Sequence, residues 1–256
     1  MGWVDSHCHL NFKALDAHAL VPDLLAHNFE AILVPATQVE LFPDVIALKN
    51  QYPHLVRVAL GLHPFFLAEH DASHLEQLEK YVIQYKPHAI GECGLDFMLS
   101  PDSVERQYFY FTAQVEIAKQ YSLPLVIHCR KAHDQIISEV KRAKFQHGGF
   151  IHGFSGSLQQ AKRYIEQGFV LGLGGALTYE RAKAMHKMVA ALPDDGFTLE
   201  TDSPDMPPAF ARNEVNTPLN VPRIAHYIAN LRGQSIDHIQ DVSRQNFYSI
   251  VGKPAG

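Results

Sequence analysis

Two histidines separated by a single residue, His7 and His9, follow a short apolar run near the N-terminus. Side chains two residues apart on a strand point to the same face, so both imidazoles can reach one metal ion. A His-x-His pair also occurs on protein surfaces without a ligand, and alone it does not establish a metal site. The interpretation therefore depends on which other ionisable residues join the pair.

Further ionisable residues follow later apolar runs of the chain, namely His63, Glu92, His128, His152 and Asp202. If these runs are parallel strands of one barrel, their carboxyl ends converge on one mouth. Imidazole and carboxylate are ligands of intermediate hardness that suit divalent metals. We therefore expect metal ligands at this mouth, with zinc as the first choice and manganese or magnesium as alternatives: His7, His9, Glu92, His128, His152 and Asp202.

Eight short apolar runs predict the strands that would position these residues. Most are rich in Val, Ile, Leu or Phe, as expected for strands buried on both faces of a parallel sheet. Stretches with helical spacing separate them, including 75–85, 104–121 and 158–167, the last ending before a possible C-cap at Gly168. The predicted strands are 3–4, 31–35, 56–60, 89–91, 125–127, 150–151, 169–173 and 197–199.

Alternation of strand and helix predicts a (β/α)₈ TIM barrel, formed by a single domain over residues 1–256. A doubly wound open sheet is the main alternative, because it is built from the same units. The length of 256 residues and the apolar fraction of 46% fit a closed barrel. The Pro-rich segment 204–208 is expected to form a long loop after the last strand.

Other residues near the predicted strand ends can each have either a functional or a purely structural role. His63 is expected to contact substrate or donate a proton, with a core histidine as the alternative. Arg130 can bind an anionic group at the rim or simply be solvated at a helix start. The segment 155–157 can offer backbone N–H groups to a phosphate or supply an N-cap. The glycines at 172, 174 and 175 complete no nucleotide-binding pattern and are expected to form a tight turn.

Three cysteines, Cys8, Cys93 and Cys129, each stand beside a predicted ligand. Strand alternation points them away from the mouth, toward the helices, so we expect them to be packing residues. Their odd number and wide spacing do not resemble a disulfide framework. With no secretory signal and no apolar stretch near about 20 residues, we expect a cytoplasmic protein that does not cross a membrane.

Six segments in order resemble the TatD-type metal-dependent hydrolases, relatives of the amidohydrolase barrels: 5–10, 61–64, 90–96, 124–130, 152–156 and 199–204. The resemblance implies two metal ions. One would be held by His7, His9 and Asp202, the other by His128 and His152, with Glu92 bridging them. It also implies deoxyribonuclease-like hydrolysis of phosphodiesters, in which the substrate is an oligonucleotide end or a small phosphodiester.

The sequence departs from the family after Asp202-Ser203-Pro204, where Asp205-Met206 replaces a frequent aromatic residue. Asp205 is therefore a candidate substrate contact of altered character. The expected chemistry has Asp202 orienting a metal-activated water and accepting its proton. His63 would protonate the leaving group, and Arg130 would stabilise negative charge on the substrate.

Two alternatives share the same ligands. One is a hydrolase of amides or lactones with a small substrate, and the other is a non-catalytic metal-binding protein with a quality-control role. Six ligands shared by two ions leave coordination positions open, which favours catalysis over a structural site. The net charge of −5 disfavours tracking along long DNA and leaves short or single-stranded DNA as the expected partner, with no obligate protein partner.

Overall fold

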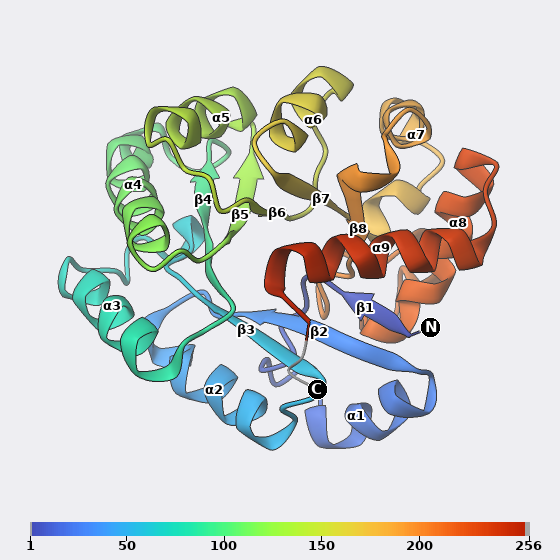
Figure 1. Ribbon diagram of the computed structural model, residues 1–256, viewed down its shortest axis with the longest axis horizontal. Helices are drawn as coiled ribbons and strands as arrows, with labels where there is room; N and C mark the ends of the chain where they lie inside the picture. The colour runs from blue at the N-terminus through green and yellow to red at the C-terminus, as the bar shows by residue number, and fades with distance from the viewer. Residues whose placement is uncertain (1, 254–256) are drawn as a thin grey trace.

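The computed structural model describes residues 2–253 and shows eight parallel strands arranged in a ring (Figure 1). Each strand pairs in parallel with the next one along the chain, from β1–β2 to β7–β8. The strands are β1 (Trp3–Asp5), β2 (Phe29–Pro35), β3 (Val56–Leu60), β4 (Ala89–Asp96), β5 (Leu125–Arg130), β6 (Gly149–Ile151), β7 (Phe169–Leu173) and β8 (Phe197–Leu199).

The first and last strands close the ring. The Ser6 backbone N–H donates to the Leu199 carbonyl oxygen at 3.0 Å, and Cys8 forms a parallel bridge with Ser203. Sequential neighbours and closure confirm the predicted (β/α)₈ barrel. They exclude the doubly wound alternative, in which the strand order would reverse.

Helices fill the connections and form an outer layer around the strands. They are α1 (Ala17–Ala26), α2 (Phe42–Gln51), α3 (Ser73–Tyr85), α4 (Val104–Gln120), α5 (His133–Arg142), α6 (Leu158–Ile165), α7 (Lys183–Ala190), α8 (Val221–Arg232) and α9 (Ile236–Val251). Of these, α9 does not join the outer layer. In Figure 1 it crosses the centre of the ring, because its buried face packs against β8, β1 and β7.

Buried apolar residues form two separate clusters. The larger lies between strands and helices and includes Phe42, Phe111 and Ile136. The smaller fills the barrel interior near the start of the strands, where Phe150 meets Phe247 of α9 with ring centroids 5.8 Å apart. The interior is therefore plugged by apolar side chains at one end, and polar groups occupy the other.

Three strands extend beyond their predicted ends, β1 by the single residue Asp5 and the other two by several residues. β4 continues through Glu92 to Asp96, and β5 continues through His128 to Arg130, so these residues lie within strands and do not follow them. Polar residues such as Glu92 and His128 interrupt the apolar pattern, which therefore predicts strands that are too short. The backbone pairing of β4 with β5 nevertheless continues as far as Asp96 and Arg130. The helix predicted over 158–167 ends earlier, at Ile165, with Glu166 as its C-cap, so the predicted C-cap at Gly168 is wrong. Gly168, with φ of 81°, instead closes the turn that follows the helix, where its N–H donates to the Ile165 carbonyl oxygen.

Candidate metal centre

The six predicted ligands come together at the carboxyl end of the barrel. His7 Nε2 lies 3.4 Å from His9 Nε2 and 3.7 Å from Asp202 Oδ1. Histidine and carboxylate atoms gather in three groups close enough to hold an ion: His7, His9 and Asp202; His7, Glu92 and His152; His63, Glu92 and His128. The strand order therefore assembles residues separated by almost 200 positions in the chain.

Glu92 is the centre of this cluster, with only 2% of its side chain exposed. One carboxylate oxygen, Oε2, lies 3.1 Å from His7 Nε2, while Oε1 lies 3.3 Å from His128 Nδ1. Burial opposes the charge, but His63 and His7 hold the pKa of Glu92 well below its usual range. An ionised carboxylate whose two oxygens face different histidines has the arrangement needed to bridge two cations.

Hydrogen bonds orient the imidazoles toward this centre. His9 Nδ1 lies 3.2 Å from the Pro35 carbonyl oxygen, which has no proton to donate. Nδ1–H is therefore the donor, and the lone pair of His9 Nε2 faces the carboxylates. Burial and neighbouring His7 lower the pKa of His9 to about 3, which keeps the ring neutral, as metal binding requires.

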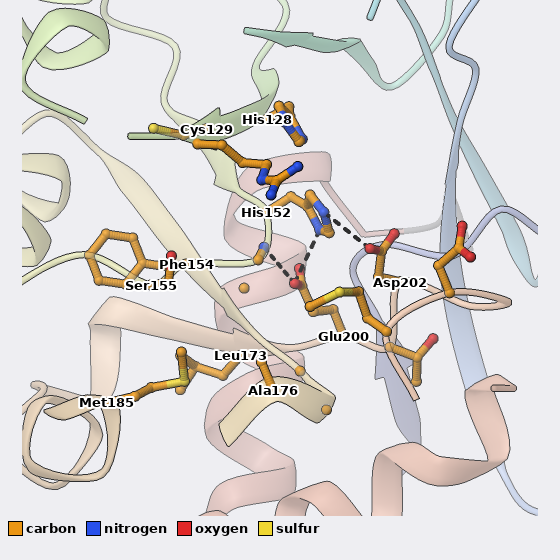
Figure 2. Close-up of a pocket in the computed structure, with 18 residues that line it drawn as sticks. His128, Cys129, His152, Phe154, Ser155, Leu173, Ala176, Met185, Glu200 and Asp202 are labelled. Atoms are coloured by element: carbon orange, nitrogen blue, oxygen red, sulfur yellow. Dashed lines mark hydrogen bonds and ion pairs between the residues drawn. The ribbon is translucent and has the colours of Figure 1, made fainter. Parts of the chain in front are cut away.

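Two carboxylates that the sequence analysis did not single out support the remaining histidines. His128 Nε2 lies 3.2 Å from Asp96 Oδ2, and His152 Nδ1 lies 3.1 Å from Glu200 Oε1. Figure 2 shows the contacts of Glu200 with His152 and of His152 with Asp202. A histidine between a carboxylate and a metal is a recurring arrangement that fixes the ring and raises its basicity.

Spacing in the sequence gives only a partial signal for these two carboxylates. Asp96 lies four residues after Glu92, and Glu200 lies two residues before Asp202. Each is thus separated from a predicted ligand by an even number of residues, as side chains on one face of a strand are. Glu200 also explains a nearby glycine. A Cβ at Gly172 would lie 1.8 Å from Glu200 Oε2, so only glycine leaves room for that carboxylate.

The predicted tight turn at 172, 174 and 175 is therefore wrong in part. Gly172 lies inside β7, where it makes room for Glu200, whereas Gly174 and Gly175 begin the following loop and its 3₁₀ turn. The three glycines are close in sequence, but the requirement at Gly172 comes from the side chain of Glu200, the residue that directly follows the neighbouring strand β8.

The cluster carries enough negative charge to favour a cation. Burial opposes a charge on His152, but Asp202 and Glu200 raise its pKa to about 10. Carboxylates therefore favour positive charge at a point lined by imidazole nitrogens, and a divalent metal ion supplies that charge. The residues present fit the metal that the donor types indicate.

His63 lies beside these residues with a different orientation. Its Nε2 is 3.2 Å from Glu92 Oε1, and its Nδ1 accepts a hydrogen bond from the Phe65 backbone N–H at 3.0 Å. Burial lowers the pKa of His63, so the neutral ring carries its proton on Nε2, facing the site. This geometry fits a proton donor better than a metal ligand.

A cavity of about 410 Å³ opens beside the histidines, as Figure 2 shows. Its lining includes Arg130 and Asp205, two of the three residues predicted to contact substrate, together with Met206; His63, the third, is not among the residues that line it. The Arg130 side chain is 57% exposed, and its Nη1 lies 3.6 Å from Asp96 Oδ2. Ser157 caps α6 through a capping box with Gln160, which confirms the N-cap reading of that segment.

The cysteines lie on the opposite side of their strands, as predicted. Cys8, Cys93 and Cys129 are buried in the cluster between strands and helices, and all are free. Cys129 Sγ lies 3.1 Å from His133 Nδ1 of α5, and burial raises the pKa of the Cys129 thiol to about 12. These thiols are packing groups of the barrel wall.

Within residues 2–253, no helix combines the length and the apolar character that a membrane span needs.

Comparison with known proteins gives consistent matches over the whole chain. The model of the family described as TatD related DNase matches residues 4–252. An uncharacterised metal-dependent hydrolase, YjjV of Escherichia coli K12, is 37% identical, covering 98% of each chain. The crystal structure of this TatD homologue superposes with a TM-score of 0.92 at 36% identity, again covering 98% of each chain. A 3'-5' ssDNA/RNA exonuclease, TatD of Erwinia amylovora, is 27% identical over 93% of this chain and 95% of its own.

Proposed function

This chain belongs to the TatD family of metal-dependent hydrolases, and on that premise we propose that it hydrolyses phosphodiesters with two divalent ions. The observation that carries the proposal is the position of Glu92, whose two oxygens face histidines on opposite sides. Around it we assign His7, His9 and Asp202 to one ion, and His128 and His152 to the other. Zinc is the first choice for both, because imidazole and carboxylate predominate.

Divalent ions, when bound, supply Lewis acidity that polarises a phosphoryl oxygen and acidifies water. Asp202 lies at the edge of the cluster, with 17% of its side chain exposed; its Oδ1 faces His7 and His9, and its Oδ2 lies 3.5 Å from His152 Nε2. In the proposed reaction Asp202 accepts a proton from the attacking water. Burial raises the pKa of this carboxyl, which favours proton acceptance.

The P–O bond to the leaving group then breaks, and His63 Nε2–H donates its proton to the departing oxygen. The proton that Asp202 took from the water then returns to His63 through solvent, which restores both groups. Phe65 holds His63 in this tautomer through the hydrogen bond to Nδ1. Arg130 lies at the rim of the same cavity and offers a guanidinium to a second phosphate oxygen. Asp205 also lines the cavity, and in the proposed reaction its charge disfavours a further phosphate and directs the substrate toward Arg130.

The exonuclease name of the Erwinia amylovora relative supports short or single-stranded DNA as the substrate of this chain. The net charge of −5 also favours short ends, because a long duplex would need a basic groove. We therefore propose an enzyme that removes or cleaves nucleotides at accessible ends.

The test strips the protein of metal, reloads it with zinc, manganese or magnesium, and assays four substrate classes in parallel. These are a phosphomonoester, a phosphodiester, a single-stranded oligonucleotide and a lactone. We expect hydrolysis of the phosphodiester and the oligonucleotide only after reloading. Asp202→Asn and His128→Ala should each lower kcat by about 10²-fold or more, because each removes a group that acts in the transition state.

Glu166→Gln, an exposed substitution directly after α6, is the matched control and should retain full activity. Hydrolysis of the lactone alone would overturn the phosphodiesterase proposal. Full metal content and full activity in both Asp202→Asn and His128→Ala would overturn the assignment of residues.

A further inference from the structure

A second polar cavity lies at the opposite end of the barrel from the metal centre. It has a volume of about 270 Å³ and is lined by residues at the end of α2, the start of β3 and the end of α9. Arg57 is the second residue of β3, and His88 directly precedes β4, so both lie where the strands begin. The proposed catalytic residues lie where strands end, and they take no part in this cavity.

Arg57 is a buried cation that lines the cavity, with only 3% of its surface exposed. Its Nη1 has three backbone carbonyl oxygens within hydrogen-bond distance, those of Pro53 at 3.1 Å, Val56 at 3.3 Å and His54 at 3.5 Å, and these neutral groups leave its charge unbalanced. Among residues 2–253, no carboxylate lies within ion-pair distance of Arg57 or of Lys49. Glu30, on the adjoining surface, is instead paired with Arg244 at 3.7 Å. A buried guanidinium without a counter-charge is unfavourable, and a bound anion would compensate it.

The other side chains add donors of the same kind. Lys49 lies at the end of α2, where its Nζ donates to the Tyr85 carbonyl oxygen at 3.2 Å. Burial and the charge of Arg57 lower the pKa of Lys49, so the two cations disfavour each other. Lys253 also lines the cavity, and none of the lining residues is acidic.

His88 contributes a neutral donor. Its Nδ1 accepts the Val58 backbone N–H at 3.2 Å, so the ring proton is on Nε2. Burial, Lys49 and Arg57 lower the pKa of His88 to about 4, which keeps the ring neutral at pH 7. A neutral histidine with Nδ1 occupied offers an N–H to an acceptor and adds no further repulsion.

We propose that this cavity, defined by Lys49, Arg57, His88 and Lys253, is an anion site that binds a phosphoryl group. Three cations and one neutral donor around a single cavity favour a doubly charged tetrahedral anion over a carboxylate with one charge. Guanidinium and ammonium are the groups that recognise phosphate oxygens elsewhere in proteins. The site is independent of the proposed hydrolysis, because it lies at the other end of the barrel.

The test uses the full chain stripped of metal, so that phosphate cannot bind through ions at the mouth. Inorganic phosphate is titrated calorimetrically at constant ionic strength, with acetate as the carboxylate probe. We expect saturable binding of one phosphate per chain. Lys49→Gln should weaken it by about tenfold or more, because it removes one charge-assisted hydrogen bond.

Lys162→Gln, an exposed substitution on α6, is the matched control and should leave phosphate affinity unchanged. Arg130→Gln at the metal-side mouth should also leave it unchanged, and Lys49→Gln should retain full hydrolytic activity after metal reloading. Absence of saturable binding, equal affinity in Lys49→Gln, or loss of binding in Arg130→Gln would overturn the site. Acetate affinity equal to that of phosphate would overturn the phosphoryl assignment.

Discussion

Glu92 and Glu200 are both buried carboxylates next to histidines, but their positions differ in one respect. Glu92 faces several imidazoles with both oxygens, whereas Glu200 contacts His152 on the nitrogen that points away from Asp202. Glu200 Oε1 also accepts the Gly153 backbone N–H at 2.7 Å, which fixes its orientation. Glu92 is thus placed to contact ions directly, and Glu200 to position a ligand.

Substitution Glu200→Gln should weaken metal binding by about 10–100-fold, because it removes the charge that orients His152 and raises its basicity. Metal content after competition with a graded chelator measures the effect. Circular dichroism should show an unchanged fold, since glutamine has nearly the same volume. An unaltered metal affinity would contradict the positioning role of Glu200.

His133 gives a residue-scale prediction about pH. Burial lowers the pKa of His133 to about 4 from a value of 6.5, and nearby Asp134 opposes the shift only in part. The unfolded chain therefore takes up a proton first as the pH falls. The stabilisation from this neutral histidine is complete above pH 6.5 and is lost as the pH falls toward about 4.

The unfolding free energy of both proteins should fall when the pH is lowered from 7.5 to 5. The fall should be about 2 kcal/mol smaller in His133→Gln than in the unaltered protein. Urea unfolding at both pH values measures this difference, and subtraction removes the pH dependence of the metal centre. His147→Gln, for which no comparable burial is found, is the control. Equal losses in His133→Gln and the unaltered protein would show that His133 does not account for the acid sensitivity.

At the scale of elements, α9 closes the barrel interior at the start of the strands. Its Phe247 is fully buried among residues from several strands, including Val4 and Phe150. The helices that connect the strands pack on the outer face of the barrel. They therefore do not cover the smaller apolar cluster in the barrel interior, which α9 covers. α9 therefore completes the core that keeps the strands in register beneath the metal centre.

Phe247→Ala should lower the unfolding free energy by about 3–5 kcal/mol, as expected when a buried aromatic ring leaves a cavity. Phe109→Ala, which removes a ring that is 51% exposed on α4, should cost less than about 1 kcal/mol. Denaturant unfolding of the two variants gives the comparison. A similar, small loss of unfolding free energy in both variants would contradict the role of α9 in completing the interior core.

At the scale of the whole molecule, the proposed metal centre joins the first strand to the last. His7 and Asp202 both contribute to it, and the Asp202 backbone N–H donates to the His7 carbonyl oxygen at 2.8 Å. Ions held across this closure would bind the folded barrel and not the unfolded chain. Metal binding should therefore stabilise the entire barrel, which we propose unfolds as one domain.

Metal at about 100 times its dissociation constant should stabilise the fold by about 2.7 kcal/mol and raise Tm by about 5–10 °C. Calorimetry of stripped and zinc-loaded protein measures the shift, and a single transition is expected in both. The double substitution His7→Ala and His9→Ala should abolish the shift. Two separate transitions, with only one responding to metal, would contradict unfolding as one domain.

The sequence alone determined the barrel and which histidines and carboxylates gather in the candidate metal centre. Alternating short apolar runs and helical stretches identify the fold class, because strand and helix periods are local properties of the chain. Ligands such as His7, His128 and Asp202 could be named because parallel strands place their carboxyl ends together, whatever the details of packing. Even the outward direction of Cys93 follows from strand alternation.

Only the tertiary structure decided which side chains support those ligands and which groups remain unpaired. Asp96 and Glu200 were missed because contact with a histidine depends on register and rotamer between strands, which local pattern does not encode. The same holds for α9, whose position over the barrel interior depends on packing with residues from distant strands. Arg57 is one basic residue among 22 in sequence. Burial without a carboxylate, a property of the folded arrangement, is what distinguishes it.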